Sequence, residues 1–288
     1  MKENISDLFS EVFDLSAQQS KQAEIQAREQ CKNGSASMVA AISALYSIWK
    51  FFQQLPAGSP ASSVVTAPTN LAVANHISLL CNSALSIRKL AFLGFEPQAK
   101  VLTRSLVETI YQTLVIFHDH NSYLVYKKGI DANSAKGAHY TAFAKKQSLH
   151  KKIQKLEDSF GSQSSAERNE QYTQRVDMLE HYSQATHSSV THVLQSALQP
   201  NDESILEPTI LGKFSVSTDN TLLNCSHEIC YFCMLLEHII EKIWFIDGLD
   251  SDENYRMFSE VFRVAAKFRT HKLKLLDASN ENAQTVLT

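Results

Sequence analysis

The chain has 288 residues, a net charge of −3 and an ordinary share of hydrophobic residues, so it is long enough to bury a sizeable core. This charge balance excludes a strongly basic nucleic-acid-binding protein, although a local basic surface stays open. Only eight glycines and six prolines are present, and this scarcity of turn residues favours long helices over all-β or parallel α/β folds.

Five cysteines, an odd number, and an N-terminus without the basic and apolar regions of a secretory signal predict reduced thiols in a cytoplasmic protein. No stretch reaches eighteen purely apolar residues; the one that comes nearest, 71–87, is uncharged but carries six polar side chains, too many for a membrane span. We therefore expect no membrane partner.

The N-terminal part, 1–55, is predicted to form a helical pair. Apolar residues from Ile5 to Leu15 have helical spacing, whereas 17–32 is polar and is expected at the surface. Asn33-Gly34 is expected to end the first helix. A loop rich in Pro and Ser over 56–69, a main bundle over 70–276 and a frayed tail over 277–288 complete the predicted organisation, which we favour as one continuous domain.

The stretch Val101–Phe117 is predicted to form a helix that is apolar nearly all round, and it has only two charges, Arg104 and Glu108. Gly94 is expected to end the preceding helix, and Pro97 suits the first turn of the next, so the two helices should pack as an antiparallel hairpin. Because a buried charge is costly unless it is paired, we expect Arg104 and Glu108 inside the bundle, both reaching a second helix.

The C-terminal half is predicted to contain a helix over Tyr172–Leu198, an apolar helix over 219–247, and a final helix capped by Ser251 or Asp252. The sequence thus predicts an all-α fold. We expect a single bundle of seven or eight mostly long antiparallel helices, with one irregular or short hairpin stretch near 200–220.

Several common sites are missing from the sequence. It has no glycine-rich phosphate loop, no His-Glu-x-x-His and no diiron motif. Three cysteines and two histidines gather near an apolar helix, where buried thiols are a commoner role than zinc ligation, so no metal or cofactor is expected. These residues are Cys225, Cys230, Cys233, His227 and His238.

Two further patterns, an Arg–His spacing and a group of lysines, can each be explained without a function as well as with one. Arg175 and His181 match the loose Arg-x4-6-His spacing of HEPN-type ribonucleases, but a chain of this composition supplies such a match by chance. The lysines between Lys136 and Lys155 are typical of a solvated helix face, and alternatively of a stripe that contacts phosphates.

The candidate site combines Arg104 and Glu108 with the polar run that contains Tyr182, Ser183 and His187. One interpretation is a polar network that sets the register of the helices. The other is a catalytic site with His187 as general acid or base, Arg104 stabilising a phosphate oxyanion, and Glu108 beside them. The ligand-binding residues would be Tyr111, Tyr182 and Ser183.

These residues resemble a bacterial all-helical family, the domain of unknown function numbered 5677, over about residues 70–247. The matching positions are Arg104, Ser105, Leu106 and Glu108, followed by Tyr182, Ser183, His187 and Ser188. The resemblance implies an analogy with phage-defence proteins and HEPN-type ribonucleases, without implying a reaction.

Three functions therefore stay open. The first is a phage-defence or toxin-type protein that acts on RNA or nucleotides through Arg104, Glu108 and His187. The second is a non-catalytic binding or regulatory module in which the same cluster is structural; a protein partner or a homodimer is consistent with it. The third is a bundle that binds a small anion, which requires an accessible Arg104. Whether the protein is an enzyme is left open by the sequence.

Overall fold

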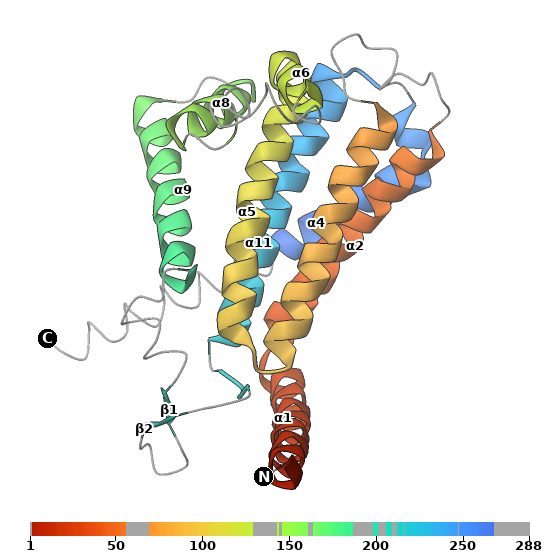
Figure 1. Ribbon diagram of the computed structural model, residues 1–288. Coiled ribbons are helices and arrows are strands. Elements are labelled where there is room, and N and C mark those ends of the chain that lie inside the picture. The colour runs from red at the N-terminus through yellow and green to blue at the C-terminus, as the bar shows by residue number, and fades with distance from the viewer. Residues whose placement is uncertain are drawn as a thin grey trace, which may run out of the picture.

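The computed structural model describes residues 2–55, 69–128, 143, 146–160, 164–186, 198–200, 206–208, 212–215, 217–246 and 248–267. Over these residues the fold is an all-α bundle (Figure 1). Its elements are α1 (Lys2–Gln30), α2 (Lys32–Gln54), α4 (Asn70–Phe92), α5 (Glu96–His118), α6 (His120–Lys128), α8 (Lys146–Asp158), α9 (Ser165–Thr186) and α11 (Thr218–His238), followed by a π-helical turn (Ile239–Ile243), a 3-10 turn (Leu249–Ser251) and a helix over 253–267.

Helices α2, α4, α5 and α11 form the centre of the molecule, with α2 packed most extensively against α11 and α4. Helices α8 and α9 lie outside this centre, next to α5 (Figure 1). Buried polar contacts supplement the apolar packing: Ser37 of α2 shares a hydrogen bond of 2.7 Å with Ser226 of α11 and donates to the Ala265 carbonyl. The predicted all-α bundle is confirmed.

The α4–α5 hairpin forms as predicted because Gly94 adopts a left-handed conformation, φ +83°, that ends α4. The Phe95 N–H then donates to the Leu90 carbonyl, which satisfies an acceptor at the helix end. Pro97 stands in the first turn of α5. A side chain at position 94 would also lie 2.8 Å from the Lys213 nitrogen, so this turn allows the chain before α11 to approach closely.

The apolar stretch of α5 is buried mainly in its second half, where every residue from Ile110 to Phe117 except Gln112 is buried. Glu96, at the start of α5, is buried as well. Its Oε1 accepts hydrogen bonds from Ser217 and Thr221 at the start of α11 and pairs with Lys100 at 2.7 Å. This carboxylate therefore joins the beginnings of α5 and α11.

The break between the first two helices differs from the prediction. Asn33-Gly34 does not end α1; the break is at Cys31, and Gly34 lies in the first turn of α2. The reason is a close contact: the Gly34 N–H donates to Asp219 Oδ1 at 2.7 Å, and a Cβ on Gly34 would lie 2.6 Å from the Asp219 carbonyl oxygen. We call Gly34 a contact glycine, because only a residue without a side chain allows α2 to lie this close to α11.

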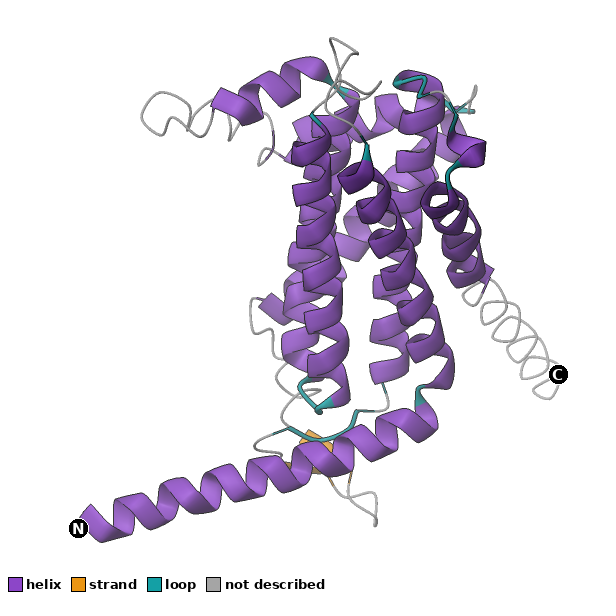
Figure 2. Cartoon of the chain, turned by 90° about the vertical axis from the view of Figure 1, so that its right-hand side faces the viewer, coloured by secondary structure: helices purple, strands orange, loops and turns teal. Residues whose placement is uncertain are grey.

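Helix α1 projects crosswise from the end of the bundle (Figure 2). The prediction that 17–32 lies at the surface is wrong for Ala23 and Ala27, which are buried because this half of α1 packs on the bundle. The apolar residues Val12, Phe13 and Leu15 are instead exposed, Phe13 by 70%. The polar half is therefore anchored through Ala23 and Ala27, whereas Val12, Phe13 and Leu15 are uncovered.

A short antiparallel hairpin pairs β1 (Leu198–Pro200) with β2 (Leu206–Pro208), at the beginning of the stretch where the sequence allowed one. The final helix is capped by Asp252, one of the two predicted caps, whose Oδ1 accepts from the Tyr255 N–H, and it buries Tyr255, Phe258 and Phe262. The predicted loop up to residue 68 and the tail over 277–288 lie outside the described residues.

By length and composition, α2 is long and apolar enough to cross a membrane; it is the one such helix among the described residues. Half of the relevant stretch is buried inside the bundle. The same apolar character is what a central helix of the core requires.

Candidate functional site

Arg104 joins the two segments of the predicted site, one on α5 and one on α9. Its Nε donates to Glu108 Oε1 at 3.0 Å along α5, and its Nη1 donates to Ser183 Oγ on α9 at 2.6 Å. The guanidinium therefore bridges α5 and α9. Both charges were expected to reach a second helix; Arg104 makes such a contact, with Ser183 as its partner, whereas the contact of Glu108 is with Arg104 on its own helix.

The expected burial of the pair is wrong. The Arg104 side chain is 24% exposed and the Glu108 side chain 46% exposed. Both lie where α9 covers α5 from outside the central helices, so water reaches the carboxylate. An ion pair in such a position contributes little to stability, about 0–1 kcal/mol.

The two predicted tyrosines are both buried, as members of the hydrophobic core. Tyr111 packs edge-on against Tyr231 and His150, with ring centroids 6.4 and 6.1 Å apart. Burial is the main cause that raises its pKa well above the usual range, so its hydroxyl stays protonated. Tyr182 is 1% exposed. A ligand at Arg104 would find Ser183 at the surface but neither tyrosine.

His187 follows Thr186, the last described residue of α9, and lies outside the described residues, as does His192; of His181 the side chain is not described. The expected meeting of His187 with Arg104 therefore stays a prediction.

Among the ion pairs of the described residues, the one with both side chains most deeply buried is a different one, between Arg175 of α9 and Glu157 of α8. Both side chains are about 95% buried. Arg175 Nη1 donates to Glu157 Oε1, its Nη2 donates to Gln154 Oε1 at 3.0 Å, and the Tyr231 hydroxyl of α11 donates to the same Glu157 oxygen at 2.6 Å. This arginine–glutamate cluster joins α8, α9 and α11.

The arginine–glutamate cluster was missed because both residues lie in polar segments. A signal exists in the spacing: Arg175, Leu179 and Tyr182 are four and three residues apart, which places the arginine on the apolar face of α9. Glu157 likewise follows Leu149, Ile153 and Leu156 at the edge of the buried face of α8. Burial, then the neighbouring Glu157, raises the pKa of Tyr231, so its hydroxyl remains a donor.

Ser159 and His238 have the contact of a nucleophile and its base, with 2.9 Å between Ser159 Oγ and His238 Nε2. Ser159 also donates to the Leu156 carbonyl at 2.6 Å, and a hydroxyl has only one proton. His238 must then be the donor, so it does not act as a base toward Ser159. Stacking of its ring on Phe160, with centroids 3.9 Å apart, further indicates that the contact fastens the end of α8 to α11.

The cysteines behave as buried thiols. Cys225, Cys230 and Cys233 all lie on α11 with under a tenth of their surface exposed, and burial raises the pKa of the Cys230 thiol to about 12. Within the described part of the chain, no group of three His, Cys, Asp or Glu residues could hold a metal ion.

Of the lysines between Lys136 and Lys155, α8 presents Lys151 and Lys155 to solvent. Lys152 donates to Ser122 Oγ at 2.6 Å and lies 3.7 Å from Asp119. This lysine is therefore engaged in fastening α8 to the start of α6, whereas Lys136 and Lys145 lie outside the described residues.

Comparison with known proteins matches no family model, no curated protein and no solved structure. The resemblance to the domain of unknown function 5677 stays a prediction.

Proposed function

We propose that this protein is a non-catalytic helical binding module in which Arg104, Glu108 and Ser183 serve to hold α9 on the bundle. The observation that carries the proposal is the direction of the Arg104 hydrogen bonds: two of its nitrogens are engaged by side chains of its own chain, one of them on the neighbouring helix. The arginine–glutamate cluster holds the same helix in the same way. Both clusters act as cross-links between helices.

A second copy of the chain is the partner that we propose for this module, bound through α1. Val12, Phe13 and Leu15 leave an apolar surface on a helix that projects from the body (Figure 2). Residues 2–14 carry four carboxylates and one lysine, whereas 15–32 carry three cations and two carboxylates. Antiparallel pairing of two α1 helices therefore brings the acidic half of each toward the basic half of the other.

Measuring molar mass in solution by light scattering tests this partner. We expect a dimer for the natural chain and a monomer for Phe13→Glu. The matched control is Leu71→Glu, which adds the same charge at a similarly exposed apolar residue of α4. A natural chain that is monomeric at all concentrations, or a Phe13→Glu variant that still dimerises, contradicts the partner.

A second candidate function is the one that the sequence suggested, a phage-defence or toxin-type protein acting on RNA or nucleotides with Arg104, Glu108 and His187. It is favoured by one observation: Arg104 and Glu108 are accessible beside Ser183, four residues before His187 in the sequence. RNA cleavage and growth under phage challenge, measured for the natural chain and for His187→Ala, separate the two functions. Activity that is lost in His187→Ala with unchanged thermal melting supports the enzyme and contradicts the binding module.

A further inference from the structure

An open groove of about 680 Å³ lies beside the junction of α1 and α2. Residues of α1, α2, α4 and the final helix line it, so it is formed by parts of the chain that are far apart in sequence. Three of the lining side chains are cationic, and none is acidic. The lining residues are Arg28, Lys32, Ser35, Ala36, Val39, Ala40, Arg88, Phe92 and Val264.

The three cationic side chains differ in whether a carboxylate already pairs with them. Arg28 pairs with Glu24 on its own helix at 2.6 Å, and because both side chains are exposed this pair is weak. Within the described residues, Lys32 and Arg88 have no carboxylate within ion-pair distance. Lys32 and Arg88 can therefore bind an incoming anion. Arg28 can also bind it, because little free energy is lost when it leaves Glu24.

Arg88 is the cation whose position is best defined. Its guanidinium lies 4.5 Å from the centre of the Phe92 ring, and its Nη2 donates to Ser35 Oγ at 3.3 Å. Its Nε is buried without a hydrogen-bond partner. A guanidinium that is stacked, partly removed from water and not neutralised is the kind of group that binds phosphate oxygens in a planar, two-point manner.

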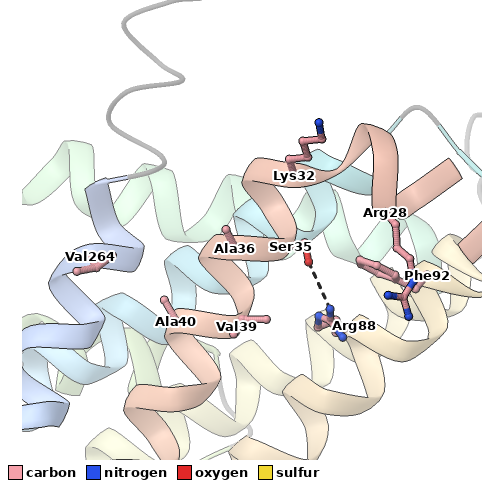
Figure 3. A pocket seen from close by; sticks show the side chains of 9 residues that line it. All are labelled: Arg28, Lys32, Ser35, Ala36, Val39, Ala40, Arg88, Phe92 and Val264. Atoms are coloured by element: carbon pink, nitrogen blue, oxygen red, sulfur yellow. Dashed lines mark hydrogen bonds between the residues drawn. The ribbon is translucent and has the colours of Figure 1, made fainter. Parts of the chain in front are cut away.

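The rest of the groove is apolar. Figure 3 shows Arg28, Arg88 and Phe92 toward one end and Val264 at the other, with Ala36 and Ala40 on the α2 surface between them. Val39 and Val264 are each nearly half exposed. A ligand with a phosphoryl group and a small apolar portion would therefore cover both parts of the groove, and the volume is in the range of small-molecule sites.

We propose that this groove binds a small organic phosphate, with the phosphoryl group on Arg88, Lys32 and the Ser35 hydroxyl and the organic portion on Val39 and Val264. The shared chemistry is the phosphate monoester; its organic portion could be a nucleoside or a short alkyl chain. This site is separate from Arg104 and does not require the proposed function, but it shares Arg28 and Lys32 with the basic half of α1 and α2 that the proposed pairing would use.

Calorimetric titration with three probes tests the site: adenosine monophosphate, hexyl phosphate and inorganic phosphate. We expect at least one organic phosphate to bind ten times more tightly than inorganic phosphate, and the better of the two identifies the organic portion. The titrations are repeated on Phe13→Glu, in which the acidic half of a second α1 does not compete for the same cations. Equal affinity for all three probes, or no binding at millimolar concentration, overturns the proposal.

Three variants and a matched control locate the binding. Lys32→Glu and Arg88→Gln should each weaken organic phosphate binding at least tenfold, and Val39→Asp should weaken it while inorganic phosphate binding changes less. Lys89→Glu is the control because Lys89 is exposed on the same helix next to Arg88 but does not line the groove. Lys32 is exposed, so Lys32→Glu stays informative if Arg88→Gln unfolds the protein. Unchanged affinity in Lys32→Glu also overturns the proposal.

Discussion

Two arginines with different surroundings hold the same helix, and the surroundings decide what each contact contributes. Arg104 is partly in water, where its hydrogen bond to Ser183 replaces hydrogen bonds to solvent at a small net gain. Arg175 is out of water, and its charge is tolerated because Glu157 and Gln154 accept from it. Removing a hydrogen-bonding partner should therefore lower the free energy of unfolding strongly for Arg175 and only slightly for Arg104.

Glu157→Gln should lower the free energy of unfolding by about 3–5 kcal/mol, because it leaves the buried Arg175 charge without compensation. Replacing both residues, as in Glu157→Leu with Arg175→Met, should recover part of this loss, because no uncompensated charge remains, although the Tyr231 hydroxyl loses its acceptor. Urea unfolding measures both. A double variant that is as unstable as Glu157→Gln would show that the pair contributes stability of its own.

The Arg104–Ser183 contact should have a coupling energy of about 0.5–1.5 kcal/mol in a double-mutant cycle of Arg104→Ala and Ser183→Ala. Glu108→Gln should change the free energy of unfolding by less than about 0.5 kcal/mol, because its side chain is half exposed. Equilibrium unfolding in urea gives all of these values. A coupling energy of zero would mean that Arg104 does not hold α9.

Stability should fall as pH rises above about 9, because burial raises the pKa of the Cys230 thiol from 9.0 to about 12. The neutral thiol is favoured in the folded state, so its contribution is complete below the unfolded pKa and is lost between pH 9 and 12. Each pH unit between the unfolded and the folded pKa lowers the free energy of unfolding by about 1.4 kcal/mol. Urea unfolding at pH 8 and 10.5 should show a smaller decrease for Cys230→Ala than for the natural chain; equal decreases would assign the pH dependence to other groups.

Hydrophobic periodicity predicted the helices well, but it predicted less well which parts of the chain each helix contacts. The α4–α5 hairpin follows from Gly94 and Pro97, which act locally, and the final helix follows from Asp252 and its apolar spacing. The end of α1 was misplaced because Gly34 makes a contact with Asp219, a residue 185 positions away. No local pattern contains that information.

Gly34→Ala distinguishes a contact glycine from a helix-ending glycine by the sign of its effect. In an unobstructed helix the alanine would stabilise by up to about 1 kcal/mol. Here the new Cβ would meet the Asp219 carbonyl oxygen at 2.6 Å, so we expect a loss of about 1–3 kcal/mol. Thermal unfolding with calorimetry measures the change. Stabilisation would show that α2 and α11 can separate at this point without cost.

In the whole molecule, a buried centre of α2, α4, α5 and α11 carries two less embedded parts, α1 and α9. The candidate site was half predictable: the low charge of α5 identified Arg104, and the hydroxyl-rich run identified the segment that it contacts, but Tyr182 and His187 were expected as the partners and the contact is with Ser183. The buried pair was assigned to the wrong arginine, because burial of Arg175 depends on α8 and α11 closing over it.

Hydrogen exchange of α9 in Arg104→Ala and in Arg175→Ala shows whether these arginines cross-link the helices. We predict faster exchange of the amides of Ser165–Thr186 in both variants, more so in Arg175→Ala, while those of α2 and α4 keep the protection of the natural chain. Natural protection of α9 in both variants would contradict the account, since it would show that neither arginine is needed to hold this helix on the bundle.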